Sequence, residues 1–167
     1  ATIATTANVT ASVPINVTGG IIIGDLKVTL DISHTWIGDM IISLEGPASI
    51  GSPEIILLNQ PCTGSGSTYP NILATLDEAG TALVCEATSP VVRGVVVPVE
   101  SFTAFNGLNA DGVWTLKVSD VGNQDGGAIN AVSLNFCNVV PGTLSSNDTV
   151  LNSLKVFDIH WNGILKK

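Results

Sequence analysis

The sequence at residues 26–32 reads Leu-Lys-Val-Thr-Leu-Asp-Ile, with an apolar side chain at every second position. Successive side chains of a β-strand point to opposite faces, so this alternation predicts a strand with one buried face and one polar face. The same period recurs at residues 40–44, 114–118 and 128–136. Shorter apolar runs at residues 55–58 and 95–99 indicate further strands.

Turn-forming residues separate these runs. They occur at Gly19-Gly20, Gly46-Pro47, Asn106-Gly107, Asp111-Gly112 and Asp125-Gly126-Gly127. Their spacing implies about eight to ten short strands, and no stretch has a helical period flanked by caps. Antiparallel strands in this number must bury two facing sheets. We therefore expect an all-β fold, a jelly-roll β-sandwich of antiparallel strands.

The composition limits the partners that the chain can have. The 167 residues carry a formal charge of -8, and only 12% of them are charged. Binding to phosphate backbones needs clustered lysine and arginine, so we expect no nucleic-acid partner. No apolar run approaches the roughly 20 residues of a membrane helix, so no membrane insertion is expected. The amino end lacks the layout of a signal peptide, which favours a mature segment.

The three cysteines are too few and too irregularly spaced for a zinc site. Cys62 and Cys85 flank a polar loop and could close it as a disulfide, which would indicate an exported protein. Cys137 is then left over. In an exported protein, an odd cysteine indicates a partner outside this segment, a free thiol or a truncated chain.

Catalytic groups are scarce in this sequence. A hydrolase triad needs a histidine-like base, and only His34 and His160 are available. His34 ends the strand at residues 26–32 and shares its inward face, which favours a partly buried structural histidine. A glycosidase-like carboxylate pair among Asp39, Asp77 and Glu78 is an alternative, but the sequence does not give their separation. We therefore expect no catalytic activity.

The acidic residues at strand ends and in loops are better candidates for binding calcium, which takes six to eight oxygen ligands. These residues are Asp39, Asp77, Glu78, Asp120 and Asp125. The loop at residues 119–127 is the strongest candidate, since two aspartates, an asparagine and a glutamine lie there among glycines. Its spacing differs from that of an EF-hand. The alternative is an ordinary connection rich in Asp, Asn and Gly.

The composition changes from Pro141 onward. Residues 141–148 read Pro-Gly-Thr-Leu-Ser-Ser-Asn-Asp, which is typical of a linker. Residues 150–167 form a short apolar and basic tail that we expect to belong poorly to the sandwich. Two parts are therefore expected, the sandwich at residues 1–140 and a linker with a tail at residues 141–167.

An ordered set of motifs resembles the P domain, or Homo B domain, of proprotein convertases. The motifs lie at residues 34–44, 75–79, 105–107, 112–120 and 125–127, with matching order and spacing. The resemblance implies a jelly-roll sandwich without catalytic residues, which follows a protease domain and helps it to fold. It also implies that the corner at Gly38 and Asp39 is structurally important, and it favours calcium near Asp39, Asp77 and Asp120.

The sequence departs from the convertases in two places. Ile37 stands where the convertases usually have an arginine before the glycine and aspartate, so an Arg-Gly-Asp motif is absent. The loop between Cys62 and Cys85, and the closing Asn135-Phe136-Cys137, are more similar to copies in secreted proteins of the Bacteroidetes. In those copies the final cysteine often pairs with one upstream of the first strand.

The tail at residues 144–157 resembles the entry to a type IX secretion sorting domain, although Asp158 follows where that family usually has Pro-Asn-Pro. The resemblance implies the type IX secretion machinery as a partner and a secreted or cell-surface location in a bacterium. The motif Asp148-Thr149-Val150 also fits a bacterial O-glycosylation pattern, which makes Thr149 a candidate glycosylation site.

The sequence thus favours a non-catalytic accessory module that stabilises or targets a neighbouring domain of the same polypeptide, often a protease, with calcium as cofactor. The alternative is an adhesive module of a surface protein, because jelly rolls frequently bind carbohydrate or protein through their end loops.

Overall fold

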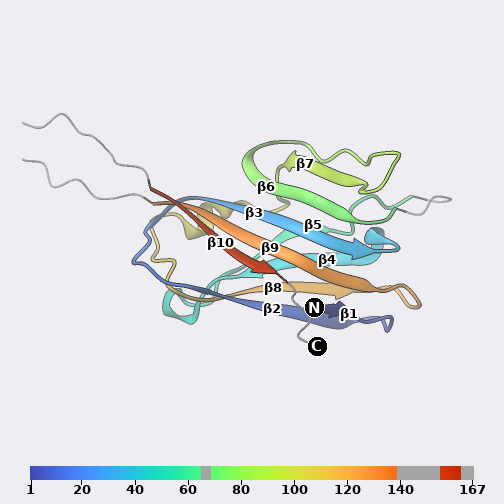
Figure 1. Cartoon of the computed structure of the whole chain (residues 1–167), viewed down its shortest axis with the longest axis horizontal. Coiled ribbons are helices and arrows are strands. Elements are labelled where there is room, and N and C mark those ends of the chain that lie inside the picture. The colour runs from blue at the N-terminus through green and yellow to red at the C-terminus, as the bar shows by residue number, and fades with distance from the viewer. Residues whose placement is uncertain (65–68, 139–154, 163–167) are drawn as a thin grey trace, which may run out of the picture.

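The computed structural model describes residues 1–64, 69–138 and 155–162, and these ranges contain ten strands (Figure 1). The strands are β1 (Thr2–Ile3), β2 (Val9–Val17), β3 (Ile23–His34), β4 (Met40–Glu45), β5 (Glu54–Asn59), β6 (Ile72–Thr81), β7 (Val92–Val96), β8 (Gly112–Asp120), β9 (Gly127–Asn138) and β10 (Lys155–Asn162). Three short 3-10 turns join some of them, η1 (Ile37–Asp39), η2 (Ala48–Ile50) and η3 (Phe102–Phe105).

The strands form two sheets that pack face to face. One sheet has the order β1-β9-β3-β6-β7, with β10 also paired to β9, and the other has the order β2-β8-β4-β5. Within the described ranges, β6 and β7 are parallel and the other neighbours are antiparallel. The chain passes from one sheet to the other after β1, β2, β3, β5, β7 and β8. The predicted all-β sandwich is confirmed.

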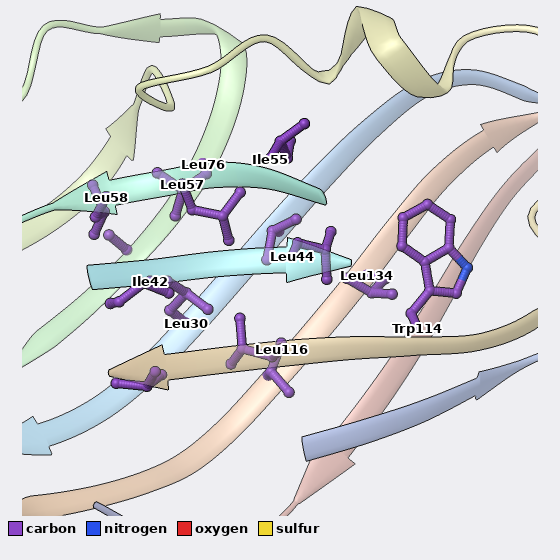
Figure 2. Close-up of a cluster of buried hydrophobic side chains, with 14 of the residues drawn as sticks. Leu30, Ile42, Leu44, Ile55, Leu57, Leu58, Leu76, Trp114, Leu116 and Leu134 are labelled. Carbon is purple, nitrogen blue, oxygen red and sulfur yellow. The ribbon is translucent and has the colours of Figure 1, made fainter. Parts of the chain in front are cut away.

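The core lies between the two sheets and follows the alternation of the sequence. Leu26, Val28, Leu30 and Ile32 of β3 are fully buried, as the pattern predicts. Figure 2 shows Leu30 and Leu134 from one sheet beside Ile42, Leu44 and Leu116 from the other. Burial of each such side chain stabilises the fold by about 1.5–3 kcal/mol. The core therefore fixes which residues of each strand point outward.

The tail corrects one expectation. Residues 150–167 were expected to belong poorly to the sandwich, but Lys155–Asn162 form β10 and pair antiparallel with β9 (Figure 1). Ile159 and Trp161 are partly buried against the core. Thr149, the predicted glycosylation site, and the predicted boundary at residues 140–141 lie outside the described residues.

Candidate functional site

Two chain segments meet at one end of the sandwich. The first leaves β3 at His34, turns through η1 and enters β4 at Met40. The second leaves β8 at Asp120 and enters β9 at Gly127. The strand register brings them together, since Met40 lies opposite Asp120 and His34 lies opposite Gly127. We call the residues 34–39 and 120–127 the corner site.

His34 and Asp120 form a buried pair at the bottom of the corner site. His34 Nε2 lies 3.0 Å from Asp120 Oδ2, and neither side chain has exposed surface. The Trp36 amide donates a hydrogen bond to His34 Nδ1 at 3.1 Å, so Nδ1 carries no proton. The ring therefore carries its proton on Nε2 and donates it to Asp120. The Gly122 amide donates to the other oxygen, Oδ1, at 2.9 Å.

Asp39 lies next to this buried pair, against Gly122, and is itself partly buried. Its pKa is raised by burial and then by the negative charges of Asp120 and Asp125, while His34 acts in the opposite direction. Its carboxylate packs directly against the backbone of Gly122, where a Cβ atom would clash with Oδ2. No group in the described part of the chain donates a hydrogen bond to the Asp39 carboxylate. Asp39 is thus a crowded carboxylate with unused oxygen atoms.

Asp125 lies on the second segment of the corner site, facing the first. The Thr35 hydroxyl donates a hydrogen bond to Asp125 Oδ1 at 2.9 Å, which ties the two segments together. The Gln124 amide donates to the Thr5 carbonyl at 2.9 Å. These bonds hold the loop in a position that leaves Asp125 near Asp39, in agreement with the charge interaction between them.

Asp77 and Glu78 lie elsewhere, inside β6 and not at a strand end or in a loop as the sequence analysis expected. Asp77 forms an ion pair with Lys27 at 2.6 Å and accepts a hydrogen bond from the Ala79 amide. Lys27 precedes His34 by seven positions on β3, which corresponds to roughly 20 Å along a strand. Glu78 accepts hydrogen bonds from the Ser101 hydroxyl and the Phe102 amide. The structure therefore brings together Asp39, Asp120 and Asp125 and keeps Asp77 and Glu78 apart from them.

The corner site has carboxylate oxygens that accept no hydrogen bond from the described residues, both oxygens of Asp39 and Oδ2 of Asp125, and a hard cation takes such oxygens as ligands. The two oxygens of Asp120 already accept hydrogen bonds, and Asp39 has none. In the described ranges, no group of three or more His, Cys, Asp or Glu side chains is arranged to hold a metal ion. An ion at this end would therefore depend on Asp39 and Asp125 with further oxygens from the surrounding backbone.

His34 does not have the setting of a catalytic base. Both ring nitrogens of His34 are engaged inside the core. His160 lies on β10 and pairs with Asp158 at 2.8 Å, and its side chain is 58% exposed. An imidazole that works as a general base needs one ring nitrogen free to reach its substrate. His34 does not meet this condition, and it acts as a structural donor to Asp120.

The disulfide that the sequence suggested is present in the structure. Cys62 and Cys85 form a disulfide that closes the loop between β5 and the residues after β6. Cys137 is partly buried and has a free thiol in the described part of the chain.

The described residues contain no helix with the length and apolar character of a membrane span.

The sequence analysis missed the pairing of His34 with Asp120. The signal for it was present in the alternation, since Trp114, Leu116, Val118 and Asp120 all fall on the same face of β8. A carboxylate on the buried face of a strand requires a polar partner. The only strand histidine on the facing sheet with inward parity at the same end was His34, so the pair could have been proposed.

Comparisons with known proteins give partial matches. The chain is 33% identical over 112 residues to the calcium-dependent protease of Trichormus variabilis, and the match covers 67% of this chain. It has the same identity over the same length to the calcium-dependent protease of a Nostoc species. The chain spans about 14% of the length of these two relatives. No protein-family model matches the chain, and no solved structure matches it significantly.

Proposed function

We propose that this chain is a non-catalytic, P-domain-like accessory module of a secreted or cell-surface bacterial protein. It would stabilise or target a neighbouring domain of the same polypeptide, most often a protease. The observation that carries the proposal is the match to a small part of two much longer proteins named calcium-dependent protease. A segment of that size that folds into a two-sheet sandwich suits an added module.

The absence of catalysis in this proposal rests on the state of His34. Its ring is enclosed in the core, accepts a hydrogen bond at Nδ1 and donates at Nε2. A histidine used in this way orients the end of a strand and cannot reach a substrate. The disulfide between Cys62 and Cys85 supports the export part of the proposal, because disulfides persist in oxidising compartments.

Calcium is the proposed cofactor, and the corner site is its proposed place. Asp39 and Asp125 would supply carboxylate oxygens, and Asp120 would hold the Gly122 amide and His34 beneath them. Burial, and then the negative charges of Asp120 and Asp125, raise the pKa of Asp39, and bound calcium would favour its ionised form against both. Asp77 and Glu78 have no part in this proposal, because each is engaged in a separate set of contacts.

The accessory role is tested with the longer protein that contains this chain. We expect that deletion of residues 1–138 lowers the melting temperature and the soluble yield of the neighbouring domain. Gly127→Ala, which disturbs the corner site within an intact chain, should lower them to a smaller extent. A neighbouring domain that melts and accumulates identically with and without the module would contradict the proposed role.

A second candidate function is an adhesive module, and one observation favours it. A hollow of about 390 Å³ lies at the opposite side of β4 and β8 from the core, lined among others by Glu45, Ser49, Asp111 and Thr115. Such polar groups could hydrogen-bond to a sugar. A glycan array with the purified chain tests this, and binding that is lost in Asp111→Ala would favour adhesion over stabilisation.

A further inference from the structure

The side of β9 that faces away from β3 is covered by two different strands. β3 pairs with one side of β9 over most of its length. On the other side, β1 covers Gly127 and Ala128, and β10 covers residues 131–138 (Figure 1). In the described part of the chain β10 pairs with no strand other than β9. The edge of β9 is therefore completed by a strand that has a single neighbour.

This edge offers both backbone and side-chain contacts. Without β10, residues 131–138 would present unpaired N–H and C=O groups, and such an edge readily pairs with another extended chain. β10 also places Ile159 opposite Leu134 and Trp161 opposite Val132. Both side chains of β10 are partly buried against the core. A strand on this edge is thus recognised by its backbone and by apolar side chains at alternate positions.

The connection to β10 is longer than the pairing requires. Asn138 and Lys155 lie directly opposite each other, so a hairpin of about two residues would be enough to join them. The sequence instead places residues 139–154 between them, including Pro141 and Gly142. A long connection does not force β10 onto this edge. β10 must therefore keep its place through its own contacts with β9 and the core.

The two described side chains on the outward face of β10, Asp158 and His160, add little to these contacts. Asp158 and His160 form an ion pair with each other, and their side chains are 48% and 58% exposed. An exposed pair of this kind contributes about 1 kcal/mol or less. The attachment of β10 therefore depends on its backbone and on the inward face that carries Ile159 and Trp161.

We propose that the edge of β9 at residues 131–138 is a strand-binding site. β10 occupies it within the chain, and an extended segment with apolar side chains at alternate positions can occupy it in place of β10. Recognition is by strand addition, in which backbone pairing supplies affinity and the alternate side chains supply specificity. β10 acts as an intramolecular competitor with an effective concentration of millimolar order. The site is independent of calcium and of the proposed accessory role.

The test uses the full chain and a labelled synthetic peptide with the sequence of residues 155–162. In Ile159→Glu/Trp161→Glu, the inward contacts of β10 are lost. We expect this variant to bind the peptide at least about tenfold more tightly than the wild type, as measured by fluorescence anisotropy. The matched control, Asp158→Asn/His160→Asn, changes the exposed face of the same strand and should bind like the wild type. A peptide with glutamate at both inward positions should bind to none of them.

Equal affinity of the peptide for the wild type and the double glutamate variant would overturn the proposal, as would no binding to either. Hydrogen exchange supplies a second measurement. The β9 amides of residues 131–138 should exchange faster in the double glutamate variant and regain protection when the peptide is added. Protection that does not return contradicts the proposal. If the double variant does not fold, Ile159→Ala replaces it and should give a smaller gain in affinity, and no gain would overturn the proposal.

Discussion

His34 and Asp120 are 86 residues apart in the chain, yet His34 Nε2 lies 3.0 Å from Asp120 Oδ2 and both side chains are fully buried. The pair joins the end of β3 in one sheet to the end of β8 in the other. Asp120 accepts two hydrogen bonds, from His34 and from the Gly122 amide. It thereby connects the two sheets and sets the start of the loop that carries Asp125.

Replacement of Asp120 by asparagine should destabilise the fold. Both oxygens of Asp120 face donors, and an amide group can accept from only one of them while its own NH₂ faces the other. His34 cannot change tautomer to help, since its Nδ1 accepts from the Trp36 amide. We expect Asp120→Asn to lower the free energy of unfolding by about 2 kcal/mol.

Chemical denaturation of the wild type and the variant measures this change. Asp158→Asn is the matched control, because Asp158 is an exposed aspartate on a strand. An unfolding free energy of Asp120→Asn that equals that of the control would show that the buried pair does not stabilise the sandwich.

The pH dependence of stability should reveal the ion pair of Asp77. Burial alone would raise the pKa of Asp77. Hydrogen bonds from Lys27 and the Ala79 amide have the larger combined effect, so the pKa lies below its ordinary 3.8. A carboxyl with a lowered folded pKa binds fewer protons in the folded state, so it stabilises fully above its unfolded pKa. This stabilisation is lost as the pH falls through the folded pKa.

We therefore expect Asp77→Asn to melt at a lower temperature than the wild type at pH 7 and to approach it as the pH falls below 3.8. Lys27 is 42% exposed, so the difference at pH 7 should be about 1 kcal/mol or less. A difference in melting temperature that stays constant from pH 7 down to acid unfolding would count against this assignment.

Two glycines of the corner site should respond differently to alanine. At Gly127 a Cβ atom would clash with the Ser33 carbonyl and lie 2.9 Å from His34 Cα, and this backbone cannot move without breaking the pairing of β3 and β9. At Gly122 the clash is with the Asp39 carboxylate, which can rotate away. We expect Gly127→Ala to cost about 1–3 kcal/mol of stability or more and Gly122→Ala to cost clearly less.

Thermal unfolding of the two alanine variants provides the comparison. A smaller loss for Gly127→Ala than for Gly122→Ala would mean that β3 and β9 approach each other less closely than the structure indicates.

The disulfide should stabilise the chain through its loop. Cys62 and Cys85 are separated by 23 positions. Closing a loop of this length lowers the conformational entropy of the unfolded chain, which stabilises the folded state by about 3 kcal/mol. We expect Cys62→Ser/Cys85→Ser to lose about this much stability in urea. Cys137→Ser is the control, because Cys137 has a free thiol, and it should change stability little. A double variant as stable as this control would contradict the prediction.

Much of the fold is predictable because alternation is a local property. Leu26, Val28, Leu30 and Ile32 follow the period of a strand, and all are buried. The same period is compatible with parallel and antiparallel neighbours, so the sequence does not reveal that β6 and β7 are parallel. The attachment of β10 was also missed, since it depends on an unfilled edge of β9 that only the assembled sheet creates.

The candidate site was predictable only in part. Turn signals correctly placed Asp39, Asp120 and Asp125 at strand ends or in loops, whereas Asp77 and Glu78 lie inside β6. Which of the acidic residues converge is set by the strand register. Met40 lies opposite Asp120, which brings Asp39 to the loop of Asp125. Leu76 lies opposite Val28, which places Asp77 beside Lys27 and far from that loop. Register depends on the packing of the whole sheet, so no single motif contains it.

Calcium binding at the corner site is tested most directly by the melting temperatures of the wild type and Asp39→Asn, each in chelator and in excess calcium. In chelator, Asp39→Asn should melt at or above the wild type, because the raised pKa of Asp39 means that its ionised form disfavours the folded state at neutral pH.

In calcium at about 100 times the dissociation constant, the wild type should gain about 2.7 kcal/mol, or several degrees. Asp39→Asn should gain little, and the exposed control Asp158→Asn should gain as much as the wild type. A wild type that melts at the same temperature in chelator and in calcium would contradict calcium binding, and an equal gain in Asp39→Asn would place the ion elsewhere.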